Sequence, residues 1–241
     1  MTGSGRVAVI TGGARGLGRE LSEAFAAAGY RVAAAGRDES AAEGLDRSRI
    51  GFHKADVTDA GSVRALFDEV AELHGRVDVL VANAGISVPG PVATAPAGDW
   101  AAVVHTNVVG TFHSVQAAVP HLERTGGRIL TLSSALATRV TPFASAYSAS
   151  KAAIETLTRT AAVELAPRGI TVNCLAPGII DAGMGRSLAA NEAVWPRYAK
   201  RLAMGRPGRG AEVAAAALFL AGPDAGYVNG HVLEVNGGLD W

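Results

Sequence analysis

The clearest chemical signal in this sequence is a tyrosine and a lysine four residues apart, Tyr147 and Lys151. If this segment is helical, the two residues lie on one face, roughly 6 Å apart along the axis. An ammonium group at that distance favours tyrosinate and lowers a phenol pKa that is normally ~10, so Tyr147 could act as a general acid and base. A chance pair is the alternative. However, Lys151 is one of only three lysines, and an arginine would not replace a compact ammonium group.

A second signal is a glycine-rich turn, Thr11-Gly12-Gly13-Ala14-Arg15-Gly16-Leu17-Gly18, which separates a short apolar run from an amphipathic segment. Glycines let backbone N–H groups approach a pyrophosphate, and the N-terminus of the following helix stabilises its charge. An ordinary strand-to-helix connection would look similar. The position of the turn between an expected strand and an expected helix favours a dinucleotide site.

The residues after the next apolar run indicate which nucleotide is bound. An NAD site usually has an acidic residue there, which binds the ribose 2′-hydroxyl. Here Gly36 is followed by Arg37, and the first carboxylate is Asp38. Together with Arg15, Arg37 could hold a 2′-phosphate by charge-assisted hydrogen bonds. Arginine is common throughout this chain, which is the neutral explanation, but its presence at both positions predicts NADP(H).

An alternating series of strands and helices must position these residues. Short apolar runs predict seven strands, at 7–11, 31–36, 50–54, 77–83, 128–133, 170–176 and 231–235. Helical patterns lie between them, including long ones at about 98–118, 145–166 and 211–221. This alternation predicts an α/β fold with a Rossmann-type, doubly wound, seven-stranded parallel sheet and helices on both faces. We expect a single domain over residues 1–241, with ligands at the carboxyl ends of the strands.

Further motifs follow the other expected elements in order. They are Asp56-Val57, Asn83-Ala84-Gly85, Asn107, Ser133-Ser134, Pro177-Gly178 and the segment from Asn229 to Gly238. Together with the glycine-rich turn and the Tyr147/Lys151 pair, they cover the chain from residue 6 to the C-terminus. In this combination the chain resembles the short-chain dehydrogenase/reductase family, in particular its bacterial ketoreductases of the 3-oxoacyl-(acyl-carrier-protein) reductase type.

The resemblance implies a catalytic role for four residues. Ser134, thirteen residues before Tyr147, would hydrogen-bond and polarise the substrate carbonyl. Tyr147 would donate the proton to the developing alkoxide. Lys151 would lower the tyrosine pKa and hold the nicotinamide ribose, and Asn107 would hold a water that links Lys151 to solvent.

The resemblance also implies the contacts to NADP(H). Asp56 and Val57 would meet the adenine, and the Ile180 backbone would bind the carboxamide. The full expected set is Thr11, Gly12, Arg15, Gly16, Leu17, Gly18, Arg37, Asp56, Val57, Asn83, Ala84, Gly85, Tyr147, Lys151, Pro177, Gly178 and Ile180. One position departs from the family, which usually has a threonine five residues after Pro177, where this chain has Ala182 beside Asp181. Either the loop uses another group or this contact is absent.

We expect the substrate to enter between the segments 87–91, 135–144 and 182–205. The last contains several glycines and apolar residues and is typical of a lid that excludes water, although a pair of surface helices would look similar. Arg139 could meet the phosphate of a phosphopantetheine or coenzyme A, or it could simply be solvated. The expected substrate contacts are Ser134, Leu136, Phe143, Tyr147, Met184 and Leu188.

Composition excludes several other classes. A formal net charge of +0 and a pI near 7.0 are unlike those of a nucleic-acid or membrane-surface protein. No apolar run reaches the ~20 residues that span a bilayer, and the first residues do not look like a signal peptide. Cys174 is the single cysteine, and the six histidines are scattered, so we propose no metal site. A cytoplasmic protein is expected.

Three functions remain open. The first is an NADPH-dependent ketoreductase that acts reversibly on a ketone and a secondary alcohol, with a β-ketoacyl thioester or a specialised-metabolite ketone as candidate substrates. The second is an NAD(P)-dependent alcohol or sugar dehydrogenase working oxidatively. The third is a catalytically inactive nucleotide-binding regulatory protein, which would not need Ser134 or Tyr147. The resemblance also implies a homotetramer or homodimer, formed through the helices that carry Asn107 and Tyr147.

Overall fold

The strands of this protein form one parallel sheet. The computed structural model describes residues 5–192 and 195–240, and the strand order is β3-β2-β1-β4-β5-β6-β7. The strands are β1 (Val7–Thr11), β2 (Arg31–Gly36), β3 (Ile50–Lys54), β4 (Val79–Ala82), β5 (Arg128–Leu132), β6 (Thr171–Pro177) and β7 (Val232–Val235). The predicted Rossmann-type seven-stranded sheet is therefore confirmed.

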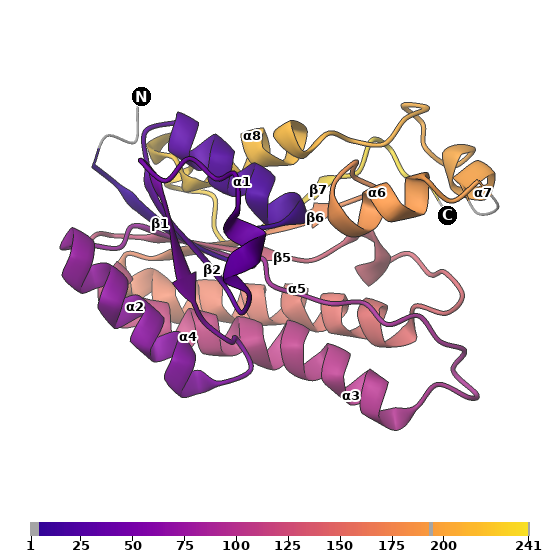
Figure 1. Cartoon of the computed structure of the whole chain (residues 1–241), viewed down its shortest axis with the longest axis horizontal. Helices are drawn as coiled ribbons and strands as arrows, with labels where there is room; N and C mark the ends of the chain where they lie inside the picture. The colour runs from indigo at the N-terminus through magenta and orange to yellow at the C-terminus, as the bar shows by residue number, and fades with distance from the viewer. Residues whose placement is uncertain (1–4, 193–194, 241) are drawn as a thin grey trace.

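The helices cover both faces of the sheet (Figure 1). They are α1 (Gly16–Ala27), α2 (Ala60–His74), α3 (Ala97–Val104), α4 (Gly110–Leu122), α5 (Ser145–Leu165), α6 (Gly183–Ala189), α7 (Trp195–Ala199) and α8 (Gly210–Ala221). Figure 1 shows α1 and α8 on one face, and α2, α4 and α5 on the other. None of the helices in the described part of the chain is long and apolar enough to cross a membrane.

Two apolar cores explain why these segments fold as they do. Phe25 of α1 and Leu220 of α8 are buried against one face of the sheet, while Phe67 of α2 and Leu122 of α4 are buried against the other. All five residues of β1 are buried, which is typical of a strand covered on both faces. The continuous apolar runs of the sequence are therefore the central strands.

The order of the strands determines where a ligand can bind. β1 pairs with β2 on one side and with β4 on the other, so the chain reverses direction across the sheet at β1. Loops that leave the carboxyl ends of β1 and β4 therefore diverge, and a crevice opens between them.

The helix expected at 98–118 has a different form in the structure. α3 and α4 are separated by a wide π-helical turn, His105–Val109, and α4 continues to Leu122. Such turns occur often at functional sites, because the extra residue redirects a side chain and frees backbone groups. Here the turn carries the buried Asn107.

Candidate cofactor and catalytic site

A cavity of about 670 Å³ lies at the carboxyl ends of the central strands. It contains nearly all of the residues that the sequence predicted to contact a cofactor. Those lining it are Gly12, Arg15, Gly16, Leu17, Gly18, Arg37, Asp56, Val57, Asn83, Ala84, Gly85, Tyr147, Lys151, Pro177, Gly178 and Ile180. Thr11 is buried just outside the lining, where its hydroxyl accepts hydrogen bonds from the backbone N–H groups of Asn83 and Ala84, each at 3.1 Å.

Particular glycines of the glycine-rich turn leave no room for a side chain. A Cβ at Gly18 would lie 2.0 Å from the Gly12 carbonyl oxygen, and Gly12 itself has φ +65°. Arg15 is the N-cap of α1, but its side chain makes no capping hydrogen bond. The first N–H groups of α1 therefore face the cavity without an intrahelical partner, which suits a phosphate.

Positive charge is concentrated at the end of the cavity beside β2. Arg15 and Arg37 both line this end. The Asp38 carboxylate instead accepts hydrogen bonds from the backbone N–H and hydroxyl of Ser40, at 2.9 and 2.7 Å, and these bonds hold its pKa below the usual range. The first acidic group after β2 is therefore engaged with its own loop.

A short turn holds the Asp56 carboxylate in one position. Its Oδ1 accepts hydrogen bonds from the backbone N–H and the hydroxyl of Thr58, at 2.9 and 2.8 Å. These bonds lower the pKa of Asp56, with a smaller contribution from the charge of Arg37. Asp56 is consequently a fixed anion at the adenine end of the expected site.

Ser134, Tyr147 and Lys151 meet at the opposite end of the cavity. Ser134 follows β5, and the other two lie on α5. The Lys151 Nζ lies 5.4 Å from the centre of the Tyr147 ring and donates a 2.7 Å hydrogen bond to the Leu132 carbonyl oxygen. The predicted grouping of these three residues is thus found in the structure.

The pKa of the buried Tyr147 phenol lies above its usual value. Burial raises it, and a hydrogen bond from Ser134 offsets only part of that rise. Burial also lowers the pKa of Lys151 to about 8, so its ammonium form is itself costly in this environment. Burial therefore sets the direction of the Tyr147 shift, and the lowering of its pKa by the Lys151 cation stays a prediction.

Asn107 lies behind the cavity rather than in its lining. Its Oδ1 accepts a 2.8 Å hydrogen bond from the Ile86 N–H, and its Nδ2 donates to the Ile86 carbonyl at 2.9 Å and to Ser150 Oγ at 3.0 Å. The amide thus holds the loop after β4 against α5. A Cβ at Gly85 would lie 3.2 Å from Asn107 Oδ1 and 3.7 Å from Lys151 Nζ, so Gly85 keeps open the space between them.

Ala182 stands where the family usually has a threonine, and the structure shows what surrounds it. Ala182 lines the cavity and precedes α6, but it offers no side-chain cap, and its N–H donates to the Ile180 carbonyl at 2.7 Å. Asp181 is exposed and paired with Arg186 at 2.8 Å. Neither side chain therefore takes the place of the usual threonine.

The expected substrate contacts are only partly found. Ser134, Tyr147 and Met184 line the cavity, whereas Leu136, Phe143 and Leu188 do not. Leu136 is held in a short turn, Ala135–Ala137, where its N–H donates to Ser134 Oγ at 3.2 Å. Phe143 is 58% exposed in a left-handed conformation, φ +69°, and Leu188 lies on the half-buried side of α6.

Arg139 does not offer a free cation. Both of its terminal nitrogens donate to the Glu234 carboxylate, at 3.0 and 2.9 Å, in a bidentate pair between the loop after β5 and β7. An anionic group would have to displace this carboxylate, so the interpretation of Arg139 as a phosphate-binding residue is not supported. Residues 182–205 contain α6 and α7, and positions 193 and 194 of this segment lie outside the described residues.

Sequence reasoning missed several lining residues. Among them are Thr58, Ile86, Thr106 and Gly183. The first three adjoin a recognised motif, so extending each motif by one position would have found them. Gly183 was missed because its role depends on the fold: its Cα lies 3.1 Å from the position of a Cβ at Gly16, where α6 crosses the glycine-rich turn. Within the described chain, no three His, Cys, Asp or Glu side chains are grouped to hold a metal ion.

Comparisons with known proteins show what the whole chain is similar to. A family model described as enoyl-(acyl carrier protein) reductase matches residues 12–240. The L-2,3-butanediol dehydrogenase of Corynebacterium glutamicum is 38% identical over 256 residues, which cover 97% of this chain and 98% of that protein. The 3-oxoacyl-(acyl-carrier-protein) reductase FabG of Staphylococcus aureus is 37% identical over 243 residues, with coverages of 96% and 97%.

A solved structure gives the same result for the fold. A short chain dehydrogenase from Burkholderia cenocepacia, in complex with NADP, superimposes with a TM-score of 0.91 at 37% identity and covers 98% of each chain. The fold, the order of the motifs and the full-length similarity all agree: the chain belongs to the short-chain dehydrogenase/reductase family of oxidoreductases.

Proposed function

We propose that this protein is an NADPH-dependent ketoreductase, which transfers hydride reversibly between NADP(H) and a ketone or secondary alcohol. The observation that carries the proposal is one cavity with Ser134, Tyr147 and Lys151 at one end and Arg15 and Arg37 at the other. We further propose that residues 1–241 act as one domain in which 182–205 is the lid.

The residues of the cavity fit a phosphorylated dinucleotide. The glycine-rich turn provides a cradle that any Cβ at Gly18 would fill, with free N–H groups at the start of α1. Arg15 and Arg37 can hold a 2′-phosphate, and the nearby Asp38 carboxylate is occupied by Ser40. A carboxylate at the end of β2 would repel such a phosphate, but that position is Gly36.

The chain's own residues supply the proton and the orientation. When bound, NADPH supplies the hydride to the carbonyl carbon. The Ser134 side chain lowers the pKa of the Tyr147 phenol and both residues line the cavity, so one substrate oxygen could accept from both hydroxyls. Ser134 would polarise the carbonyl, and Tyr147 would give its proton to the alkoxide as it forms.

The Tyr147 phenol holds the proton that reduction of a ketone consumes. Because burial raises the pKa of Tyr147, the phenol keeps its proton at neutral pH. A protonated phenol is ready to donate, whereas oxidation of an alcohol would require tyrosinate. Lys151 would hold the nicotinamide ribose, and Asn107, behind Lys151, would support the proton path through the space that Gly85 leaves open.

A second candidate is oxidation of a secondary alcohol. The similarity to a butanediol dehydrogenase over nearly the whole chain favours it, and the same residues would act in reverse. The description of the matching family model names enoyl reduction, but the relatives compared above are named for ketone and alcohol chemistry.

A screen of NADPH consumption tests the proposal. The substrates would be β-ketoacyl thioesters, cyclic ketones, quinones, diketones and sugars, each repeated with NADH. Tyr147→Phe should lose at least ~100-fold in turnover, the scale of one general acid, while NADPH binding measured by fluorescence is retained. If none of the ketones supports NADPH consumption, or if Tyr147→Phe keeps full activity, the proposal is refuted.

A further inference from the structure

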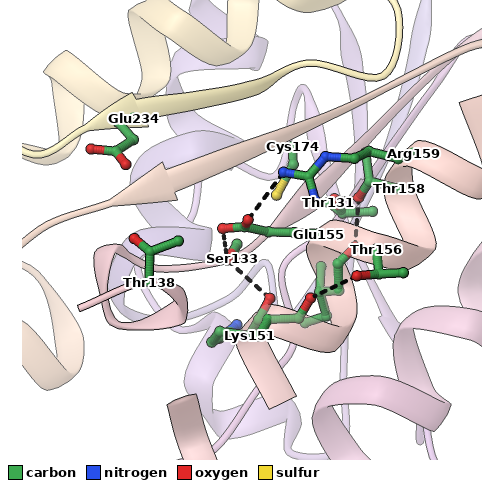
Figure 2. Close-up of polar contacts among 12 residues, drawn as sticks. Thr131, Ser133, Thr138, Lys151, Glu155, Thr156, Thr158, Arg159, Cys174 and Glu234 are labelled. Atoms are coloured by element: carbon green, nitrogen blue, oxygen red, sulfur yellow. Dashed lines mark hydrogen bonds and ion pairs between the residues drawn. The ribbon is translucent and has the colours of Figure 1, made fainter. Parts of the chain in front are cut away.

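A buried carboxylate lies one helical turn beyond Lys151 and has no part in the chemistry above. Glu155 on α5 is 7% exposed. Its Oε1 accepts a 3.0 Å hydrogen bond from Ser133 Oγ, and its Oε2 lies 3.3 Å from Arg159 Nη2. Figure 2 shows Glu155 between these two partners. It does not line the cavity.

Glu155 belongs to a row of polar contacts between β5 and α5, which we call the polar seam. Its members are Thr131, Ser133, Lys151, Glu155 and Thr158. Thr131 Oγ1 lies 2.6 Å from Thr158 Oγ1, Ser133 Oγ donates to the Lys151 carbonyl at 3.1 Å, and Lys151 Nζ reaches the Leu132 carbonyl. Alternate residues of β5 therefore meet successive turns of α5 (Figure 2).

Such a seam fixes position in a way that apolar packing does not. Hydrophobic contact has no preferred direction, so a helix packed only through it can slide or rotate at small cost. Hydrogen bonds require both distance and angle, and a buried carboxylate is costly unless it keeps its partners. Glu155 thus resists any movement of α5 that would break its contact with Ser133.

The seam is directly connected to the catalytic residues. Ser133 is the neighbour of Ser134, and Glu155 shares a helix face with Lys151. A serine hydroxyl has one proton, which Ser133 shares between the Glu155 carboxylate and the Lys151 carbonyl. A single side chain after β5 therefore joins the strand that presents Ser134 to the helix that presents Tyr147.

We propose that Glu155 is a positioning residue. Through Ser133 it sets the register of α5 on β5, and so the distance between the Ser134 hydroxyl and the Tyr147 phenol. It acts through these residues and does not touch substrate. The effect on turnover rests on the proposed ketoreductase function, whereas the effect on helix position does not.

The first test separates positioning from stability. Glu155→Leu removes the carboxylate at similar volume and leaves no partner buried without a bond, because Ser133 Oγ still donates to the Lys151 carbonyl and the Arg159 side chain is 55% exposed. The thermal midpoint should therefore stay close to that of the wild type. Misalignment of Ser134 and Tyr147 should nevertheless lower kcat roughly tenfold or more, with a smaller change in the ketone KM. Glu155→Gln keeps an oxygen acceptor for Ser133 and should recover most of the activity.

Two further variants complete the comparison. Glu164→Gln changes an exposed glutamate farther along α5 and should leave kcat unchanged. Ser133→Ala should lower kcat as Glu155→Leu does. If both act through the same hydrogen bond, the double variant should lose no more than the worse single variant.

A second readout needs no turnover. In NMR spectra of protein with ¹³C-labelled lysine, each of the three lysines gives its own Cε signal. The signal that disappears in Lys151→Met is that of Lys151. If α5 shifts in Glu155→Leu, water reaches Lys151, and its pKa should rise from about 8 towards 10.5. An unchanged Lys151 titration together with wild-type kcat would overturn the positioning role. If the wild type reduces no ketone, the proposed function fails, and the titration alone decides the role of Glu155.

Discussion

At the scale of single residues, the cations at the two ends of the cavity differ in their exposure to water. Arg15 and Arg37 are cations at one end, and Lys151 is buried at the other, with a pKa lowered to about 8. The sequence predicted these positions because each lies in a short motif of fixed spacing. It could not predict that Arg139 is paired with Glu234, because these residues are 95 positions apart. Nor could it reveal the buried Glu155, since helical periodicity alone does not identify a buried acid.

Exchange of Arg37 should change the preference between cofactors. Arg37→Asp would remove the charged hydrogen bond that we propose to the 2′-phosphate, and it would place a carboxylate beside that group. Because such bonds contribute about 1.5–3 kcal/mol, kcat/KM for NADPH should fall roughly 10- to 100-fold, while that for NADH falls less or rises. Steady-state kinetics with both cofactors would show this. Arg64→Asp, an equal change of charge on the exposed side of α2, is the control, and equal losses with both cofactors would contradict the assignment.

The buried Lys151 should make stability depend on pH. Its folded-state pKa, about 8, lies below the value of 10.5 for an ordinary lysine, so the unfolded chain binds more protons between these values. Stability should therefore rise with pH across this window. At pH 7 the cost of burying the ammonium is up to about 3 kcal/mol, and Lys151→Met should remove it. Urea unfolding of both proteins at pH 7 and pH 9.5 measures the difference, which should shrink at the higher pH; an equal difference at both would contradict the prediction.

At the scale of elements, the strands were the easiest to predict. Val7–Thr11 and Arg31–Gly36 match because a buried parallel strand is a continuous apolar run that ends near a turn. Ile50–Lys54 also matches, although this edge strand is buried only in part. The π-helical turn at His105–Val109 was missed, because it keeps the apolar spacing of its neighbours and differs only in backbone hydrogen bonds. The loop after β5 was also harder to predict. Its shape depends on Phe143, a left-handed residue whose carbonyl accepts a 2.9 Å hydrogen bond from the Gly90 N–H.

The strain in this loop can be measured by two substitutions at one position. Phe143 has φ +69°, a conformation that costs a residue with a Cβ roughly 1–2 kcal/mol, whereas asparagine tolerates it better. Phe143→Asn should therefore be more stable than Phe143→Ala by about 0.5–1 kcal/mol. The midpoints of urea unfolding give the comparison. Equal stability of the two variants would mean that the loop relaxes when the aromatic ring is removed.

At the scale of the whole molecule, several large apolar side chains are exposed on one helical layer. Trp100 of α3, Phe112 of α4 and Val163 of α5 are 43%, 47% and 77% exposed. α3 and α5 are in contact, and all three helices lie below the sheet in Figure 1. We propose that this layer joins subunits in a homotetramer or homodimer, as the resemblance implied.

Sedimentation velocity at micromolar concentration tests the assembly. The wild type should sediment as a dimer or tetramer, and Phe112→Asp should give a smaller species, because a charge buried in an interface is costly. Leu73→Asp, on α2, changes a side chain that is 63% exposed and should leave the assembly intact. A monomeric wild type would refute the proposal.

The scarcity and placement of lysine have a practical consequence for covalent attachment. Lys151 is 5% exposed, whereas Lys54 and Lys200, the other two lysines, are exposed. Amine-directed cross-linkers or a solid support would therefore couple to these two side chains and spare Lys151. With so few reactive lysines, the enzyme could be immobilised in few orientations, and Lys151 would remain chemically unmodified.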